Sequence, residues 1–485
     1  MSTSYDYDVV ILGSGPGGCA AALHTARLGL KTAVIEEKDW GGVSANTGSI
    51  PSNALLRSAE VVSFVQNEAK AFGVRVDGTV SFNFSEAFDR SRKLASQAAA
   101  DIGSRLKSSN VAQIKGRGTF RDDHTIDVAL SAGGTRSITF ANCVIAVGAE
   151  PRLVKEVPLS ARVVTCEQQI LSETLPSSIV IIGGGSRGVE FASMLHGFGV
   201  KVTIIEHLDA LLPLADADVS TELIRSFNQR GINVQRCTDV VSVDDSGPNV
   251  RVTVVDGADS EQRSPRVLEA ERVLLAVGSQ PRVTGYGLEK IGASLKPSGG
   301  IKVNEKCQIL DNDETAISHI FAVGDVTGEQ TYESVASGMG VAAASYVVGF
   351  VASHQPIQVE PYRIPKVTHC QPQVAGFGLT EKQARALYSD GCLVKTVPFS
   401  ANGKARCLGD ITGFVKIICT KDQGEILGAH VVGTGAAELV AKLALAYASE
   451  NSVGEVAASA HAMPSLGEAV QEAASNLFQA MNRTK

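Results

Sequence analysis

The sequence has little that marks a membrane, secreted or nucleic-acid-binding protein. No apolar run reaches the roughly 20 residues that cross a bilayer, and Met1–Asp8 is too polar and too short for a signal peptide. The formal net charge of −7 is spread along the chain without a basic block or an acidic tail, which gives no electrostatic reason to expect nucleic acid or an anionic membrane as partner. We therefore expect a cytoplasmic protein with no membrane span and no nucleic-acid partner.

The sequence also lacks the closely spaced cysteines and histidines that bind metals. The nine cysteines are scattered without a C-x-x-C pair, and the nine histidines form no cluster with them. Structural zinc sites need such closely spaced ligands. We predict reduced, structural cysteines and no metal site.

The composition is that of an ordinary soluble protein. The chain has 485 residues, of which 44% are hydrophobic and 20% charged. This length is large for one core and predicts two to four domains with a large buried interior.

A glycine turn follows the first apolar run. Val9–Leu12 is typical of a buried parallel strand, and it leads into Gly-Ser-Gly-Pro-Gly-Gly and then an alanine-rich helical stretch. In such a turn Gly13 permits the tight bend, Gly15 lets the backbone approach a pyrophosphate, and Gly18 lets the helix pack closely on the strand. The phosphates are then held at the helix N-terminus.

The same order recurs later in the chain. A strand predicted at Ile179–Ile182 is followed by a second turn with Gly183, Gly185 and Gly188, and then by a helix through Leu195. The two repeats together predict two bound dinucleotides.

An acidic residue closes each repeat. The predicted strand Thr32–Ile35 ends at Glu36, and Val202–Ile205 ends at Glu206. A carboxylate at this place accepts hydrogen bonds from an adenosine ribose and would repel a 2′-phosphate, so Glu206 favours NAD(H) over NADP(H). The alternative is that Glu206 merely caps a strand in solvent, but Glu36 occupies the equivalent place in the first repeat.

The segment Gly41–Asn53 reads Gly-Gly-Val-Ser-Ala-Asn-Thr-Gly-Ser-Ile-Pro-Ser-Asn. It resembles the redox-active stretch of the flavoprotein pyridine nucleotide-disulfide oxidoreductases, most closely that of the dihydrolipoamide dehydrogenases. The family has two cysteines and a lysine where this chain has Ser44, Ser49 and Asn53. A serine hydroxyl cannot form a disulfide, so the resemblance implies a family scaffold without thiol exchange. We interpret the serines as small polar residues that preserve the cysteine shape, with no catalytic duty.

The resemblance covers essentially the whole chain. It implies an α/β fold with two Rossmann-like domains, for FAD and NAD(H), plus a C-terminal α+β dimerisation domain, and hence a homodimer. Two near repeats that contain Gly148 and Gly278 resemble the family's crossings between domains. Ile320–Asp325 resembles the family's second flavin motif, in which the aspartate after Gly324, here Asp325, binds the ribityl chain. The implied boundaries are 1–150 and 279–355 for the two parts of the FAD-binding domain, 151–278 for the NAD-binding domain and 356–485 for the dimerisation domain.

The family's acid–base element also departs from its pattern. The segment His461–Glu468 resembles the family's catalytic segment, and the catalytic histidine falls on Met463, which has no titratable group. Glu468 remains in register but has no imidazole to orient. Because both sulfurs and the base are absent together, the resemblance implies a changed task.

Asn53 stands where the family's lysine pairs with a glutamate that matches Glu190. Loss of the lysine leaves a carboxylate whose isolation in a buried site would cost about 3–5 kcal/mol. Arg187 lies three residues before Glu190 on the predicted helix. One hypothesis is that Arg187 replaces the lost charge next to the reacting rings, and the other is that it points to a cofactor phosphate or to water.

The function implied is an FAD-dependent NAD(H) oxidoreductase. Electrons would pass from NADH through the flavin to a small-molecule acceptor that is not a disulfide, such as a quinone, a second nicotinamide or a dye. The alternative is a catalytically silent paralogue that keeps FAD and acts as a binding or regulatory subunit, against which the intact nicotinamide motif argues.

Overall fold

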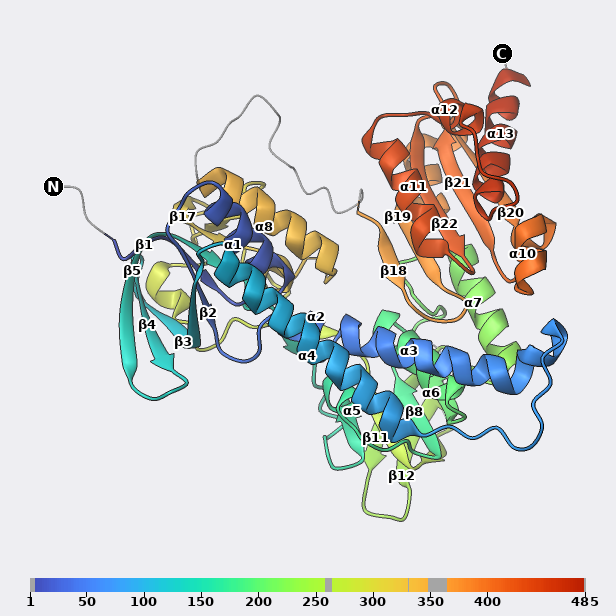
Figure 1. Ribbon diagram of the computed structural model, residues 1–485, viewed down its shortest axis with the longest axis horizontal. Coiled ribbons are helices and arrows are strands. Elements are labelled where there is room, and N and C mark those ends of the chain that lie inside the picture. Colours follow the sequence, from blue (N-terminus) through green and yellow to red (C-terminus); the bar gives the residue numbers. More distant parts are fainter. Residues whose placement is uncertain (1–4, 258–263, 330, 348–363, 484–485) are drawn as a thin grey trace. The chain divides into compact units, whose positions relative to one another are not determined.

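The computed structural model describes residues 5–257, 264–329, 331–347 and 364–483 (Figure 1). These residues form two compact units. The first comprises the described residues of Met1–Ala54, Phe88–Arg152 and Ser279–Pro361, and the second those of Leu55–Ala87, Leu153–Gly278 and Tyr362–Lys485. The predicted domain boundaries at 150 and 278 stay predictions, and the one at 355 lies outside the described residues. Among the described residues, no helix is long and apolar enough to cross a membrane.

The first unit is built on a seven-stranded sheet. Its strands, in spatial order, are β1 (Tyr7–Leu12), β2 (Thr32–Glu36), β3 (Ala112–Asp122), β4 (Thr125–Leu130), β5 (Thr135–Ile145), β17 (Ala316–Ala322) and β16 (Gln308–Leu310), and β1 also pairs with β5. The pairs β1–β2, β1–β5 and β5–β17 are parallel, whereas β4 is antiparallel to both of its neighbours. Val9–Leu12 is at most 2% exposed, so the buried parallel strand expected here is confirmed.

Helices α1 (Pro16–Arg27) and α8 (Glu333–Val347) lie side by side in this unit (Figure 1). They approach closely because glycines face each other, and a Cβ added at Gly340 would lie 2.2 Å from the carbonyl oxygen of Gly17. The other helices that begin or end here are α2 (Gly42–Asn46), α3 (Ser49–Ser63) and α4 (Phe84–Ser108). Short strands β6 (Ala149–Pro151) and β15 (Ser279–Pro281) pair antiparallel, and short helical turns lie at η3 (Leu288–Ile291) and η4 (Gly324–Thr327).

The second unit contains a five-stranded parallel sheet. Its order is β10 (Asn233–Gln235), β9 (Lys201–Ile205), β8 (Ser178–Ile182), β14 (Arg272–Leu275) and β7 (Val163–Thr165). Helices α5 (Cys166–Ile170), α6 (Ser186–Gly197) and α7 (Ala217–Arg230) connect or follow these strands. A three-stranded antiparallel sheet consists of β11 (Thr238–Asp244), β12 (Val250–Asp256) and β13 (Arg266–Ala270).

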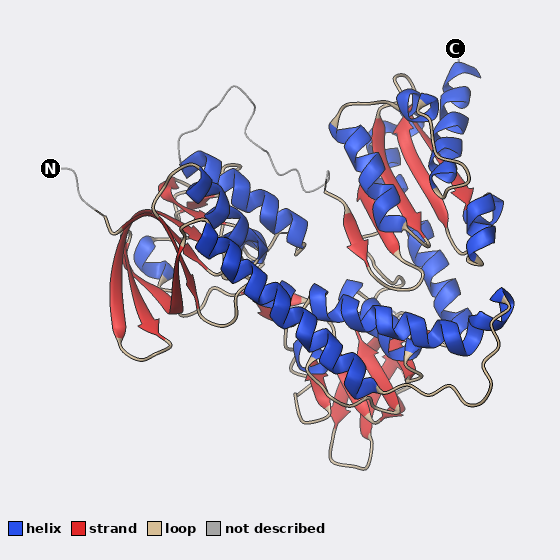
Figure 2. Ribbon diagram, viewed as in Figure 1, coloured by secondary structure: helices blue, strands red, loops and turns tan. Residues whose placement is uncertain are grey.

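The C-terminal part of this unit is an antiparallel sheet with helices around it (Figure 2). The sheet order is β18 (Lys366–Thr368), β19 (Val374–Gly378), β22 (Ile426–Val432), β21 (Phe414–Thr420) and β20 (Cys392–Pro398). Its helices are α9 (Glu381–Tyr388), α10 (Gly403–Leu408), α11 (Ala436–Ala448), α12 (Val453–Ala458) and α13 (Gly467–Arg483), and the unit's short turns are η1 (Phe64–Glu68), η2 (Ala69–Phe72), η5 (Ser389–Gly391) and η6 (Phe399–Ala401). The fold therefore has the predicted α/β class, with two sheets that contain parallel strands and a C-terminal α+β part.

A buried ion cluster joins the C-terminal sheet to α7. The Lys416 side chain on β21 is 2% exposed, and its Nζ lies 2.8 Å from Asp216 Oδ1, 2.7 Å from Asp218 Oδ2 and 2.7 Å from Glu381 Oε2. Burial opposes the ammonium charge, but the hydrogen bonds to the three carboxylates prevail and raise the pKa of Lys416. Asp216 also caps α7 by accepting from the Asp218 amide.

Candidate functional site

The first glycine turn has the geometry of a phosphate site. It follows β1 at the carboxyl end of the sheet. A Cβ added at Gly18 would lie 2.0 Å from the Gly13 carbonyl oxygen, so α1 can start this close to the strand only with glycine there. At Gly15 an added Cβ meets no described atom within 4 Å, and the turn is open at the N-terminus of α1. Main-chain N–H groups at such an opening bind phosphate oxygens.

Glu36 is held tightly beside this turn. The residue is 7% exposed, and its Oε2 accepts hydrogen bonds from the Ser14 amide at 2.8 Å and the Ser14 hydroxyl at 2.6 Å. Its Oε1 accepts from the Lys38 amide at 2.7 Å. The carboxylate, on the last residue of β2, therefore fixes the turn. Its contact with a ribose stays a prediction.

The other flavin residues predicted in this unit converge on the same edge. Gly148 follows β5, whereas Gly324 and Asp325 follow β17. Strand β5 runs parallel to both β1 and β17. Because parallel strands end at one edge, these residues and the glycine turn share it. Helix α2 also packs against the turn, since a Cβ at Gly42 would lie 3.0 Å from the Gly15 Cα. The residues present fit an FAD site at this edge.

Two serine hydroxyls and a carboxylate form a chain near this edge. Ser44 of α2 and Ser49 at the start of α3 have their Oγ atoms 3.3 Å apart. The Ser49 hydroxyl donates a hydrogen bond of 2.5 Å to Oε1 of Glu333, which is the first residue of α8. Asn53 donates from Nδ2 to the Ser49 carbonyl oxygen at 2.8 Å, a bond within α3. The serines therefore form a hydrogen-bonded pair in contact with a carboxylate that sequence reasoning did not identify.

One thiol lies beside the first glycine turn. Cys19 is the thiol of α1 beside Ser14, whose carbonyl oxygen it contacts at 2.8 Å. Burial, together with the Glu36 charge, raises the pKa of Cys19 to about 12. A thiol with this pKa is protonated at neutral pH and is a poor nucleophile. All nine cysteines are free.

The second glycine turn repeats the first within the second unit. A Cβ at Gly188 would lie 1.9 Å from the Gly183 carbonyl oxygen, and one at Gly185 meets no atom of the described chain within 4 Å. Glu206 is 8% exposed, and its Oε2 accepts from the Gly184 amide at 2.6 Å. Gly278 follows β14 at the same edge of its parallel sheet. These residues fit a second dinucleotide, and the choice of NAD(H) by Glu206 stays a prediction.

Arg187 and Glu190 both lie on α6. Arg187 Nη1 lies 2.6 Å from Glu167 Oε1. Sequence reasoning missed this acidic partner because α5 and α6 are separated by strand β8 and no local pattern shows that they meet. Glu190 Oε1 accepts from the His369 amide at 2.7 Å. The proposed pairing of Arg187 with Glu190 stays a prediction, as does a role for either residue beside the reacting rings.

Met463 lies in the loop before α13, and its side chain is 79% exposed. Glu468 Oε2 accepts from the Ser465 amide at 2.8 Å, so this carboxylate stabilises the first turn of α13. His461 Nδ1 lies 2.9 Å from the Ser459 carbonyl oxygen, to which it donates. That Met463 occupies the place of an acid–base residue stays a prediction.

Family comparisons cover almost the whole chain. Residues 7–342 match the model described as pyridine nucleotide-disulphide oxidoreductase, and residues 364–474 match its dimerisation domain. Dihydrolipoyl dehydrogenase of Mycobacterium tuberculosis is 45% identical over 468 residues, 96% of this chain and 97% of the relative. The enzyme of the same name from Bacillus subtilis is 36% identical over 480 residues, 97% of each chain. The crystal structure of LpdA from Mycobacterium tuberculosis has a TM-score of 0.87 at 28% identity and covers 97% of this chain and 99% of its own.

Proposed function

Since the chain belongs to the pyridine nucleotide-disulphide oxidoreductase family, whose dihydrolipoyl dehydrogenases bind FAD and NAD(H), we propose that it is an FAD-dependent NADH oxidoreductase with a non-disulfide acceptor. The acceptor is a small molecule such as a quinone, a second nicotinamide or a dye. The match to the dimerisation domain supports a homodimer.

The observation that carries the proposal is the serine pair. The Ser44 and Ser49 Oγ atoms lie 3.3 Å apart, at the distance and orientation of a hydrogen bond. Hydroxyls in this place cannot be oxidised to a disulfide or pass on two electrons. The half-buried Cys19 thiol, whose pKa is raised to about 12, offers no substitute.

The residues of the chain hold and orient the cofactors. The turn at Gly13–Gly18 and Glu36 hold one dinucleotide, and the turn at Gly183–Gly188 and Glu206 hold the other. Bound FAD supplies the capacity to take a hydride from NADH and release electrons again. The Ser49 hydroxyl, hydrogen-bonded to Glu333 at 2.5 Å, keeps a polar and redox-inert surface where the family exchanges thiols.

Anaerobic mixing of the purified holoprotein with NADH tests the proposal. We expect the flavin absorbance to bleach, and to recover when a quinone or a nicotinamide analogue is added. NADPH should bleach it on the order of 100-fold more slowly, because Glu206 repels a 2′-phosphate. NAD-dependent oxidation of dihydrolipoamide by the wild type would contradict the proposal. Bound FAD that NADH does not bleach would instead support a silent binding subunit.

Restored cysteines should restore the disulfide but not the activity. In the Ser44→Cys/Ser49→Cys variant the two sulfurs replace oxygens 3.3 Å apart, and a small rotation brings them to bonding distance. Thiol titration after denaturation should find the nine native thiols in the air-oxidised variant and two more after reduction. Dihydrolipoamide oxidation should stay near background, because Met463 supplies no base. Full dihydrolipoamide oxidation by this variant would show that the protein still has an acid–base group for the reaction. The single variants Ser44→Cys and Ser49→Cys are the controls, since neither can form the disulfide.

A further inference from the structure

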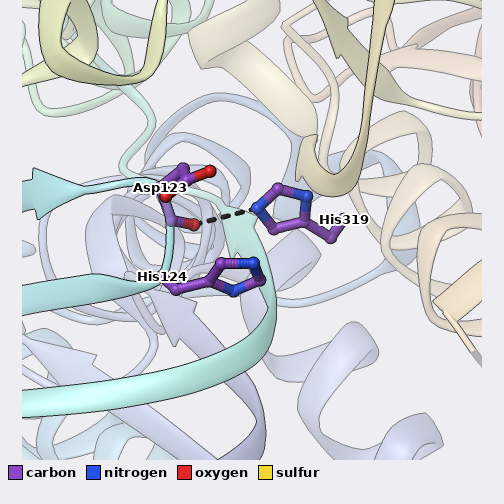
Figure 3. Close-up of side chains that lie close together, drawn as sticks. All are labelled: Asp123, His124 and His319. Carbon is purple, nitrogen blue, oxygen red and sulfur yellow. Dashed lines mark hydrogen bonds between the residues drawn. The ribbon is translucent and has the colours of Figure 1, made fainter. Parts of the chain in front are cut away.

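A cluster of metal-ligating side chains lies in the first unit, apart from the residues of its glycine turn. Asp123 and His124 form the turn between β3 and β4, and His319 lies on β17 (Figure 3). One ligand atom from each of the three residues lies within 4.8 Å of the other two. Residues 124 and 319 are far apart in the sequence, so a search for ligand spacing could not find this cluster.

The two imidazoles are oriented by main-chain oxygens. His124 Nδ1 lies 2.9 Å from the Phe140 carbonyl oxygen on β5, and a carbonyl only accepts, so Nδ1 carries the proton and Nε2 the lone pair. His319 Nε2 lies 2.9 Å from the Asp123 carbonyl oxygen, and the rings stack with centroids 4.2 Å apart (Figure 3). A hydrogen bond from the second ring nitrogen is the support that metal-binding histidines usually have.

We propose that Asp123, His124 and His319 bind one divalent transition-metal ion, with water completing the coordination. Two imidazoles and one carboxylate suit Zn²⁺, Cu²⁺ or Ni²⁺ and are a poor set for Mg²⁺ or Ca²⁺, which prefer oxygen.

Side-chain rotation closes the site, because the two stacked rings, whose planes differ by 16°, must turn for their in-plane lone pairs to converge on one ion. Metal–ligand bonds of about 2.1 Å place tetrahedral ligand atoms roughly 3.4 Å apart, so atoms within 4.8 Å need to approach by little more than 1 Å. Asp123 is exposed at the tip of the turn and can rotate. At His319 the Nε2 proton is donated to the Asp123 carbonyl, so Nδ1 carries the lone pair and can bind the metal directly. Binding at Nε2 instead requires the proton to move to Nδ1 and gives up that hydrogen bond. In both cases the imidazole stays neutral, so binding releases no proton from it and involves no redox step.

A bound ion would tie the β3–β4 turn to β17. His124 also contacts β5 through Phe140, so the ion would join parts of the sheet that are distant in the sequence. An ion that binds the folded state alone raises the melting temperature in proportion to the logarithm of its concentration.

Titration of the chelator-treated holoprotein with Zn²⁺ by calorimetry, and with Cu²⁺ by electron paramagnetic resonance, tests the site. We expect one ion per chain with imidazole nitrogen splitting in the Cu²⁺ spectrum. The His124→Phe/His319→Phe variant, which keeps ring stacking, should bind at least about tenfold more weakly and lose the melting shift. His207→Gln is the matched control, since His207 and Asp239 form an exposed pair elsewhere, and it should bind as the wild type does.

Two results would overturn the site. One is equal binding by the wild type and the double variant. The other is a Cu²⁺ spectrum of the wild type without nitrogen splitting, which needs no variant to fold. Flavin content and NADH bleaching should be unchanged in the double variant, because neither histidine belongs to the cofactor edges.

Discussion

Replacing Lys416 by methionine is expected to lower the free energy of unfolding by about 3–5 kcal/mol. The variant keeps the length of the side chain but leaves Asp216, Asp218 and Glu381 without their shared cation, and the Asp216 side chain is only 2% exposed. A buried carboxylate without a partner costs more than the pair contributes. Circular dichroism should show a melting temperature roughly 6–15 °C below that of the wild type.

The matched control is Lys395→Met on the neighbouring strand β20, where the lysine is exposed. Substitution there should change stability by less than about 0.5 kcal/mol. Equal effects of the two variants would show that the cluster contributes nothing. Because Lys416 links the C-terminal sheet to the start of α7, loss of the cluster should also lower the stability of the second unit, so that it unfolds before the first.

The effect of Lys416→Met depends on pH in a predictable direction. Hydrogen bonds from Lys416 and from the Glu381 amide overcome burial and lower the pKa of Asp216, and the bond from Lys416 lowers the pKa of Glu381. Their stabilisation is complete above the unfolded values of about 4 and is lost as the pH falls through the folded values. Lys416 contributes below about pH 10.4 and loses its contribution as the pH rises through its raised pKa. Unfolding measured from pH 3 to 7 should therefore show the difference between variant and wild type shrinking below pH 4.

Adding one methyl group to either glycine turn should disrupt dinucleotide binding at that turn and leave the other turn intact. In Gly18→Ala the new Cβ would lie 2.0 Å from the Gly13 carbonyl oxygen, and in Gly188→Ala 1.9 Å from that of Gly183. A Cβ and a carbonyl oxygen cannot approach so closely, so the helix must shift away from the phosphate-binding opening. We expect Gly18→Ala to purify with less than a tenth of the wild-type flavin, and Gly188→Ala to keep its flavin but react with NADH at least about 100-fold more slowly.

Flavin absorbance per chain and stopped-flow bleaching by NADH measure the two effects. Gly103→Ala is the control, because a Cβ at this position in α4 meets its nearest atom at 3.6 Å, an ordinary contact. A Gly188→Ala protein with wild-type bleaching would show that the second turn does not hold the nicotinamide cofactor. A Gly18→Ala protein with full flavin would exclude the first turn as the FAD site.

Local chemistry explains which features the sequence could predict. The strand, glycine turn and helix of each repeat are contiguous, and their geometry depends on short-range sterics, so Gly18 and Gly188 were recognisable as close contacts. The pairing of Val9–Leu12 with neighbouring strands follows from its continuous apolar run. The C-terminal α+β part was predicted by resemblance rather than by any one residue.

Contacts between distant segments were not predictable in this way. Glu333 reaches Ser49 only because α8 packs on α1 beside the first turn, and no local pattern marks it. Glu167 was not foreseen as the partner of Arg187, since its place at the start of α5 depends on the order of strands in the parallel sheet. The cluster of Asp123, His124 and His319 likewise depends on strand order rather than spacing.

The hydroxyl pair has a consequence for the conditions under which such a protein can work. Arsenite, mercurials and peroxide inactivate vicinal dithiol enzymes by attacking thiolates. Ser44 and Ser49 offer these agents no target, and the Cys19 thiol, whose pKa is about 12, is protonated at neutral pH. Under the function proposed above, the flavin should go on accepting hydride from NADH in the presence of such agents.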